Sequence, residues 1–335
     1  MSKKIITNLF NYAAESKSRN LIITREENHI SFDYYLPGGE RKKLSLPKKL
    51  ESNFFTNLKQ ILEIANGELV AQKYYKFSDR RQNLNFYLTI LPEANGEKII
   101  FNFIDHSSKT DWPLTQLGFQ RKDLQELKKG LKNHSGLIII STPPGEGKST
   151  ILRAIMHEIN NSEINIYSLE KKPINKLAGI NSLKLSSGNW EKILQHDSDL
   201  IFADDADDNT SLKNAMRAAA TGRLAIISLT ASDPLEVVDR LLKIAPSSLE
   251  IANLKMIING HLAKLKRSAT KAADQRKVIG LFEIFKLTPD LHKFMAVKRS
   301  NEMPDFYQKL LMLALKNGHR PLEIDRQLKI KNGLL

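Results

Sequence analysis

The chain has 335 residues, 41% of them hydrophobic, which is enough to bury a sizeable core and predicts two domains. It contains no cysteine, which excludes disulfides and any thiolate zinc or iron–sulfur site and fits a reducing compartment. No apolar run reaches the ~20 residues of a membrane-spanning helix, and the N-terminus lacks a secretory cleavage site. We therefore expect a soluble, cytoplasmic protein.

The formal net charge of +14 is uneven, because residues 251–335 hold 17 Lys and Arg against 7 Asp and Glu. Such a balance suits an anionic partner, either nucleic acid, an acidic protein surface or peripheral contact with the anionic inner face of the cytoplasmic membrane. A solvated lysine-rich surface explains the same counts. Aromatic residues do not alternate with the basic ones, and no nucleic-acid-binding motif is present, so nucleic acid is the least favoured partner.

Residues 1–105 have the pattern of a small N-terminal α+β domain. Amphipathic periodicity predicts helices over 5–14 and 54–67, the second closed by a glycine. Strands are expected at 21–26, 29–36, 41–46, 84–91 and 98–104. The next segment, 106–115, is polar, contains a proline and lacks periodicity, which predicts a linker.

Residues 116–335 alternate apolar runs with helical patterns, which predicts a doubly wound, mostly parallel sheet. Buried strands are expected at 137–141, 164–169, 200–203 and 224–229. Helices are expected at 149–160, 190–196 and 210–221, and the chain after residue 250 is expected to be mostly helical.

The most informative segment, residues 137–150, has the sequence LIIISTPPGEGKST. Its order of strand, glycine-rich loop and helix start is that of a phosphate-binding loop, and a chance GKST is the alternative. Glycines would let backbone N–H groups converge on phosphate, Lys148 would contact the β- and γ-phosphates, and the Ser149 hydroxyl would bind Mg²⁺. The residues predicted to bind the nucleotide are Pro144, Gly145, Glu146, Gly147, Lys148, Ser149 and Thr150.

A second apolar run, residues 200–203, ends in the acids Asp204 and Asp205. A phosphate-binding loop needs a strand that ends in a carboxylate to hold the magnesium shell and orient water. Asp204 is the predicted metal group and Asp205 the group that positions the attacking water. Glu170 ends another predicted strand and is the second candidate for that water. An acidic surface loop remains the alternative, since Asp207 and Asp208 follow.

The chain resembles the motor ATPases that assemble type IV pili and type II secretion systems, and six segments in order carry the likeness. They are Asp79-Arg80-Arg81, ILPEANGEKIIFNFID (90–105), the Walker B run DSDLIFADD (197–205), AATGRL with SLT (219–230), DPLEVVDRLL (233–242) and ALKNGHRPLEIDR (314–326). The resemblance implies a PAS-like domain followed by a RecA-like domain. It also implies a homo- or hetero-hexameric ring that binds ATP and Mg²⁺ and acts on an inner-membrane platform protein. Arg81, which matches the family's DGR, would approach the nucleotide in the ring, although a surface turn before the hairpin explains it equally.

The departures from the family pattern gather at the catalytic positions. They are Thr142 for the first loop glycine, Asp204-Asp205 for glycine–glutamate, Asp207 for an arginine, Arg223 and Thr230 for histidines, and RSATKAADQR (267–276) for the zinc loop. A catalytic group shortened by one methylene, as at Asp205, is misplaced by about 1 Å, which can cost ~100-fold in rate. We therefore expect ATP binding with slow hydrolysis, the alternative being a non-hydrolysing paralogue that scaffolds or regulates an active ring.

Overall fold

The computed structural model divides the chain into two compact units, Met1–Ser108 and Lys109–Leu335, the second being called here the P-loop unit. The structure describes residues 2–18, 20–36, 40–47, 53–65, 70, 73–78, 83–93, 96–104, 112–171, 177–245, 251–266, 278–297 and 305–335. Much of the predicted linker, 106–115, lies outside these ranges, so the domain limits drawn from the sequence stay predictions.

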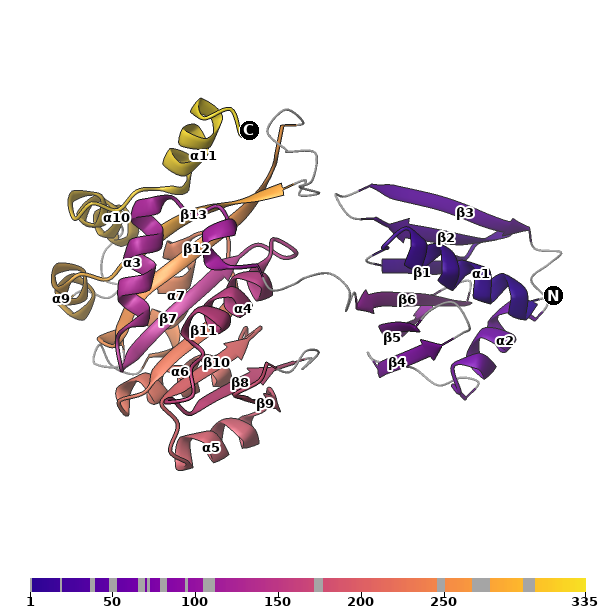
Figure 1. The fold of residues 1–335 in the computed structure, drawn as a ribbon, viewed down its shortest axis with the longest axis horizontal. Helices are drawn as coiled ribbons and strands as arrows, with labels where there is room; N and C mark the ends of the chain where they lie inside the picture. Colours follow the sequence, from indigo (N-terminus) through magenta and orange to yellow (C-terminus); the bar gives the residue numbers. More distant parts are fainter. Residues whose placement is uncertain are drawn as a thin grey trace. The chain divides into compact units, whose positions relative to one another are not determined.

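In the residues that the structure describes, the N-terminal unit is an antiparallel six-stranded sheet with two helices (Figure 1). Its strand order is β3-β2-β1-β6-β5-β4, and the name PAS-like stays a prediction. Phe10 of the first helix packs against Phe86 and Phe101 of the sheet, which form the centre of an aromatic core. The elements are α1 (Ser2–Glu15), β1 (Asn20–Arg25), β2 (His29–Tyr35), β3 (Arg41–Pro47), α2 (Phe54–Ile61), β4 (Lys73–Ser78), β5 (Asn83–Glu93) and β6 (Gly96–Ile104).

In this unit one predicted helix needs correction and one strand was missed. Helix α2 ends at Ile61 rather than at residue 67, because Glu63 adopts a left-handed backbone with φ 53°, which a continuing helix cannot contain. Strand β4 was not predicted. It is a six-residue edge strand in which only Tyr75 and Phe77 are partly buried, so the alternation by which strands are recognised extends over very few residues.

The P-loop unit is built on a seven-stranded sheet of order β13-β12-β7-β11-β10-β8-β9. All neighbouring strands run parallel except β13, which pairs antiparallel with β12 at one edge. The predicted doubly wound, mostly parallel sheet is therefore confirmed. The strands are β7 (Gly136–Thr142), β8 (Ile166–Glu170), β9 (Ile180–Lys184), β10 (Leu200–Asp204), β11 (Leu224–Thr230), β12 (Leu254–Lys264) and β13 (Val278–Lys286).

Helices cover both faces of this sheet (Figure 1). Alternate side chains of a strand point to opposite faces, so Ile138 and Ile140 of β7 enter one core while Leu137 and Ile139 enter the other. The first core is closed by η2 (Leu114–Gln116), α3 (Arg121–Leu131) and α4 (Lys148–Ile159). The second is closed by α5 (Ser187–Gln195), α6 (Asn209–Ala220), α7 (Pro234–Ile244), α9 (Pro289–Val297) and α10 (Phe306–Lys316).

The expectation that the chain after residue 250 is mostly helical is wrong. Residues 254–264 and 278–286 form β12 and β13, and β12 lies beside β7 within the sheet. Each strand contains only short apolar stretches, and such stretches do not reveal by periodicity whether they form buried strands or helices. Helices α9, α10 and α11 (Leu322–Lys331) follow. The segment 267–276, which replaces the family's zinc loop, lies outside the described residues.

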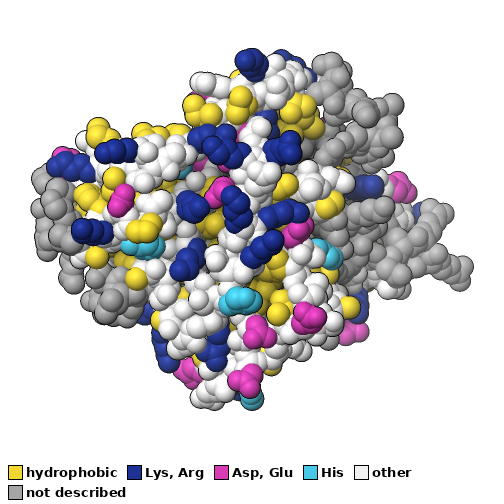
Figure 2. All heavy atoms as spheres, turned by 60° about the vertical axis from the view of Figure 1, so that its left-hand side comes forward, with side chains coloured by type: hydrophobic (Ala, Val, Ile, Leu, Met, Phe, Trp, Pro, Cys, Tyr) yellow, Lys and Arg dark blue, Asp and Glu magenta, His cyan; other side chains and the backbone are white. Residues whose placement is uncertain are grey.

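Basic side chains gather on the side of the P-loop unit that carries α3 and β13 (Figure 2). Several of them are paired. Glu126 accepts from both Lys129 and Lys286 at 2.8 Å, and these bonds lower its pKa to about 2. Part of the positive charge counted in the sequence is thus neutralised on the surface. Within the described ranges, no helix combines the length and the hydrophobicity that crossing a membrane requires.

Candidate nucleotide-binding site

The loop between β7 and α4 has the backbone of a phosphate cradle. Gly145 and Gly147 adopt φ values of 79° and 87°, a left-handed conformation that favours glycine, and Gly147 caps the N-terminus of α4. A Cβ placed on Gly145 would meet no atom within 4 Å, so the loop has open space on that side. Ser149 is exposed in the first turn of α4. The loop therefore fits a phosphate group at a helix N-terminus.

Two unusual residues of the loop are accommodated without obstructing it. The Thr142 side chain, which replaces the family's first glycine, is fully buried and donates to the carbonyl oxygen of Pro143 at 2.9 Å. The Glu146 carboxylate accepts the backbone N–H of Leu262 at 3.0 Å and lies 3.2 Å from His261 Nδ1, so strand β12 holds it. The Thr142 departure therefore changes packing beneath the loop rather than its outer surface.

Lys148 lies among oxygen atoms from the end of strand β11 and from the loop that follows β10. Its Nζ is 2.5 Å from Asp205 Oδ1 and 3.6 Å from Asp207 Oδ2, and it donates to Thr230 Oγ1 at 3.0 Å. Its side chain is only 13% exposed, whereas the side chain of Asp205 is 42% exposed, so water partly screens their contact. A phosphate that approaches Lys148 must therefore compete with the carboxylate of Asp205.

Asp207 is a further site residue whose role the sequence did not reveal. It accepts the Thr230 N–H at 2.6 Å and the Thr230 hydroxyl at 3.3 Å, which fixes the threonine that contacts Lys148. Arg240 of α7 donates to the carbonyl oxygens of Asp207 and Thr230 at 2.6 and 2.9 Å. The signals in the sequence were that Thr230 and Arg240 fall within family-like segments and that Asp207, two residues after such a segment, replaces a family arginine.

Asp204 and Glu170 are direct neighbours at the carboxyl ends of β10 and β8. Ser228 Oγ donates to Asp204 Oδ1 at 2.5 Å, and Ser168 Oγ donates to Glu170 Oε1 at 2.9 Å. Burial raises the pKa of the Glu170 carboxyl; the Ser168 hydroxyl opposes this shift and the nearby Asp204 charge adds to it. Asp205, with a left-handed φ of 56°, follows Asp204 and donates its N–H to Ser228 Oγ at 3.0 Å.

The structure thus brings most of the predicted site residues to one edge of the sheet. Lys148, Asp205, Asp204 and Glu170 all follow or end parallel strands there, where ligands bind in open α/β sheets. Among the described residues, no three His, Asp or Glu side chains are grouped to hold a metal. Arg81 lies outside the described residues, so its approach to the nucleotide stays a prediction, as does metal binding by Ser149 and Asp204.

Arg223 lies away from this site. The prediction that placed it among the catalytic, phosphate-facing positions is therefore wrong for a single chain. It precedes β11, whose first residue Leu224 pairs with Gly136 at the start of β7, whereas the loop follows the end of β7. Seven strand residues at ~3.3 Å each separate the two edges by about 20 Å. Arg223 instead donates to Ser198 Oγ at 3.0 Å and to two carbonyl oxygens before β10 at 3.2 Å.

Replacing Arg223 by alanine is therefore expected to lower stability and leave nucleotide affinity unchanged. Hydrogen bonds from a charged donor contribute about 1.5–3 kcal/mol, which for a unit of this size shifts the melting temperature by roughly 3–10 °C. Thermal denaturation and nucleotide titration measure the two effects, with the exposed Arg217→Ala as the matched control. A normal melting temperature combined with weakened nucleotide binding would contradict this placement.

A parallel sheet, a glycine-rich loop that opens a helix and strand-end carboxylates beside the loop lysine define a P-loop protein with a RecA-like domain. The family model for "Type II/IV secretion system protein" matches residues 1–303, and the chain belongs to this family. The chain is 24% identical over 307 residues to the type II secretion system protein E of Xanthomonas campestris pv. campestris, a match that covers 87% of this chain and 53% of that protein. It therefore spans about half the length of the curated relatives it matches.

Two solved structures share the fold over nearly the whole chain. The Legionella pneumophila ATPase DotB superposes with a TM-score of 0.72 at 16% identity, and the match covers 99% of this chain and 92% of the DotB chain. The pilus retraction motor PilT, solved with bound ADP, has a TM-score of 0.63 at 17% identity and covers 95% of each chain. These findings confirm the resemblance and the RecA-like fold.

Proposed function

We propose that the chain binds Mg-ATP at the loop 144–150 and hydrolyses it slowly as the motor ATPase of a type IV pilus or type II secretion-like assembly system. The observation that carries this proposal is the position of Lys148, which lies at the start of α4 against the carboxylate that follows β10. The bound ADP named for PilT adds support from a protein of the same fold. As in other P-loop proteins, Mg²⁺ would neutralise phosphate charge when bound.

Each residue has a distinct part in this proposal. Gly145 and Gly147 shape the loop, Lys148 binds phosphate oxygens, and Ser149 with Asp204 would hold the metal. Glu170 is suited to accept a proton, because burial raises its pKa towards the range in which a general base works at neutral pH. Asp205 holds Lys148 in the nucleotide-free chain and remains a candidate for positioning water.

The alternative is a non-hydrolysing paralogue that scaffolds or regulates an active ring. It is favoured by the pairing of Lys148 with Asp205 and Asp207, which replace the glutamate and arginine of the family pattern. In either role we propose a homo- or hetero-hexamer that works in the cytoplasm with an inner-membrane platform protein. The basic surface of Figure 2 suits peripheral contact with anionic lipid, and this also stays a proposal.

We expect the purified chain to release phosphate from ATP in a Mg²⁺-dependent reaction. Nucleotide should also raise the melting temperature, because a ligand that binds only the folded state stabilises it by RT ln(1 + [L]/Kd). Hydrolysis is measured as phosphate release with and without EDTA. Binding is measured from melting curves with and without Mg-ATP. Binding without turnover would support the paralogue instead, and neither binding nor turnover would refute both readings.

Ring formation is tested separately by light scattering at several protein concentrations with and without Mg-ATP. We expect nucleotide to favour the assembled form, since the resemblance places the nucleotide where neighbouring domains close. A chain that stays monomeric under every condition cannot be an autonomous motor and could act only in a ring built with another subunit.

A further inference from the structure

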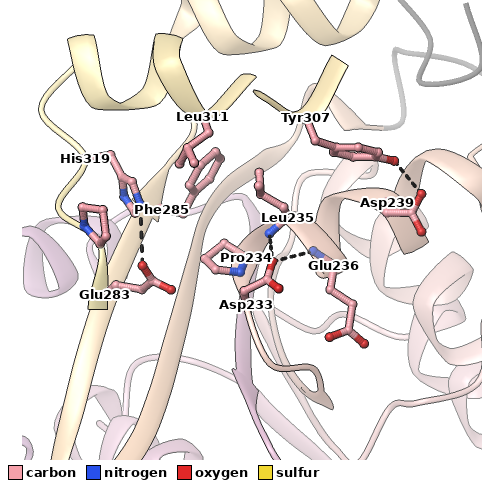
Figure 3. Close-up of a pocket in the computed structure, with 11 residues that line it drawn as sticks. Asp233, Pro234, Leu235, Glu236, Asp239, Glu283, Phe285, Tyr307, Leu311 and His319 are labelled. Carbon is pink, nitrogen blue, oxygen red and sulfur yellow. Dashed lines mark hydrogen bonds and ion pairs between the residues drawn. The ribbon is translucent and has the colours of Figure 1, made fainter. Parts of the chain in front are cut away.

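A pocket of about 440 Å³ lies in the P-loop unit between the start of α7, strand β13 and helix α10 (Figure 3). Phe285, Tyr307 and Leu311 give it an apolar and aromatic side. Its remaining wall carries the carboxyl groups of Asp233, Glu236, Asp239 and Glu283. No lysine or arginine is among the described residues that line it. An acidic pocket of this kind is unusual on a chain with a net charge of +14.

The carboxyl groups differ in the hydrogen bonds and ion pairs that they already make within the protein. Asp239 accepts from the Tyr307 hydroxyl at 2.5 Å and pairs with Lys243 at 2.6 Å. Asp233 caps α7 by accepting two backbone N–H groups. In Figure 3 the Tyr307–Asp239 pair stands on one side of the pocket and the Glu283–His319 pair on the other.

Glu283 is the most deeply placed of these acids, with 6% of the residue exposed. Its oxygens accept from Asn259 Nδ2 at 3.0 Å and from the Leu322 N–H at 2.9 Å, and His319 Nε2 is 3.6 Å away. Burial raises the pKa of Glu283 and lowers that of His319, so the histidine is not a permanent cationic partner. Glu283 has no lysine or arginine partner among the described residues, and a cation that entered the pocket would favour its charged form.

We propose that this pocket receives a lysine or arginine side chain from a basic peptide segment of a partner protein, with an adjacent apolar side chain packed on Tyr307 and Leu311. The volume is within the range of pockets that bind compact ligands, and a guanidinium or ammonium gains both carboxylate hydrogen bonds and contact with an aromatic ring. Glu236 accepts the Ser232 N–H through one carboxylate oxygen at 2.8 Å and is exposed, so a peptide can reach the acidic wall from the surface.

A chain of buried hydrogen bonds joins this pocket to the P-loop. Glu283 binds Asn259, and Ser141 Oγ donates to Asn259 Oδ1 at 3.0 Å. Ser141 and Asn259 are both fully buried, and Ser141 is followed directly by Thr142 and the loop. Buried polar groups have few alternative partners, so a change at Glu283 is passed to the strand that carries the loop. The occupied pocket should therefore alter nucleotide affinity, an effect that rests on the proposed function.

The first test compares two short peptides on the full chain by calorimetry and thermal denaturation. Acetyl-arginyl-leucine amide is the probe, and its citrulline counterpart, which keeps the shape and loses the charge, is the control. We expect the arginine peptide to bind at least tenfold more tightly and to raise the melting temperature. Glu236→Gln and Glu283→Gln should each remove most of this preference, while Glu323→Gln on the exposed face of α11 should not.

Equal affinity for the two peptides, or no binding of either, would overturn the proposal. Glu236 is exposed, so its variant tests the pocket even if Glu283→Gln fails to fold. Self-association that Glu236→Gln abolishes would assign the pocket to a second copy of this chain and overturn the partner-protein assignment.

In a second experiment, saturation with the arginine peptide should change the affinity for a fluorescent ATP analogue at least threefold. Peptide binding without that change would refute the coupling, and absence of nucleotide binding in both states would refute the proposed function while the peptide result stands.

Discussion

Lys148→Ala is expected to weaken nucleotide binding by about 100-fold and to abolish phosphate release. Hydrogen bonds to charged groups contribute about 1.5–3 kcal/mol each, and the substitution removes the only lysine of the loop. It also leaves Asp205 and Asp207, both within 4 Å of the lysine Nζ, without that cation. Their charges would then repel phosphate, so the loss of affinity should exceed that of a simple contact. Titration with a fluorescent ATP analogue measures it.

The controls separate charge from folding. Lys129→Ala removes an exposed lysine of α3 that lies outside the site and should leave binding unchanged. Asp205→Asn keeps the lysine and removes its anionic competitor, so it should bind nucleotide at least as tightly as the unmodified chain. If Lys148→Ala binds normally while its melting curve shows a folded protein, the loop is not a nucleotide site.

The central part of the fold was predictable because its signals are local. The strand, the glycine loop and the amphipathic helix of residues 137–159 are contiguous, and each follows from periodicity and from the backbone freedom of Gly145 and Gly147. Strands β12 and β13 were missed, because a short apolar run becomes a strand only when a neighbour offers a ladder of hydrogen bonds. For β12 that neighbour is β7, more than a hundred residues earlier in the chain, and β13 pairs in turn with β12 at the edge of the sheet.

The site was only partly predictable for a related reason. Asp207, Thr230 and Arg240 come from three segments, and only the packing of α7 against the end of β11 brings them together beneath Lys148. The grouping of Arg223 with Thr230 failed because one family-like segment spans the whole of β11. The two residues therefore lie at opposite edges of the sheet. Residues at the two ends of a strand are close in the sequence but far apart in space, and a sequence motif does not show this distance.

Glu170→Gln is expected to reduce turnover by at least about 100-fold while nucleotide affinity changes little, since a general base contributes 10²–10⁴-fold in typical enzymes. Glu170 is the better candidate than Asp205, because Asp205 is already held by Lys148 at 2.5 Å whereas Glu170 has a raised pKa and a hydroxyl partner. Single-turnover phosphate release measures the rate. Glu163→Gln, an exposed glutamate before β8, is the matched control and should be silent.

The pH dependence gives this assignment its sharpest test. A base must be deprotonated to act, so turnover should fall as the pH drops through the pKa of Glu170. Because burial raises that pKa, the fall should begin at higher pH than for an ordinary glutamate. In Glu170→Gln the residual rate should no longer show this fall, which is the acid limb of the pH–rate profile. If Glu170 and Asp205 act on one water, the double variant should lose no more activity than the worse single variant. Full activity in Glu170→Gln, with an acid limb that persists and disappears only in Asp205→Asn, would transfer the role to Asp205.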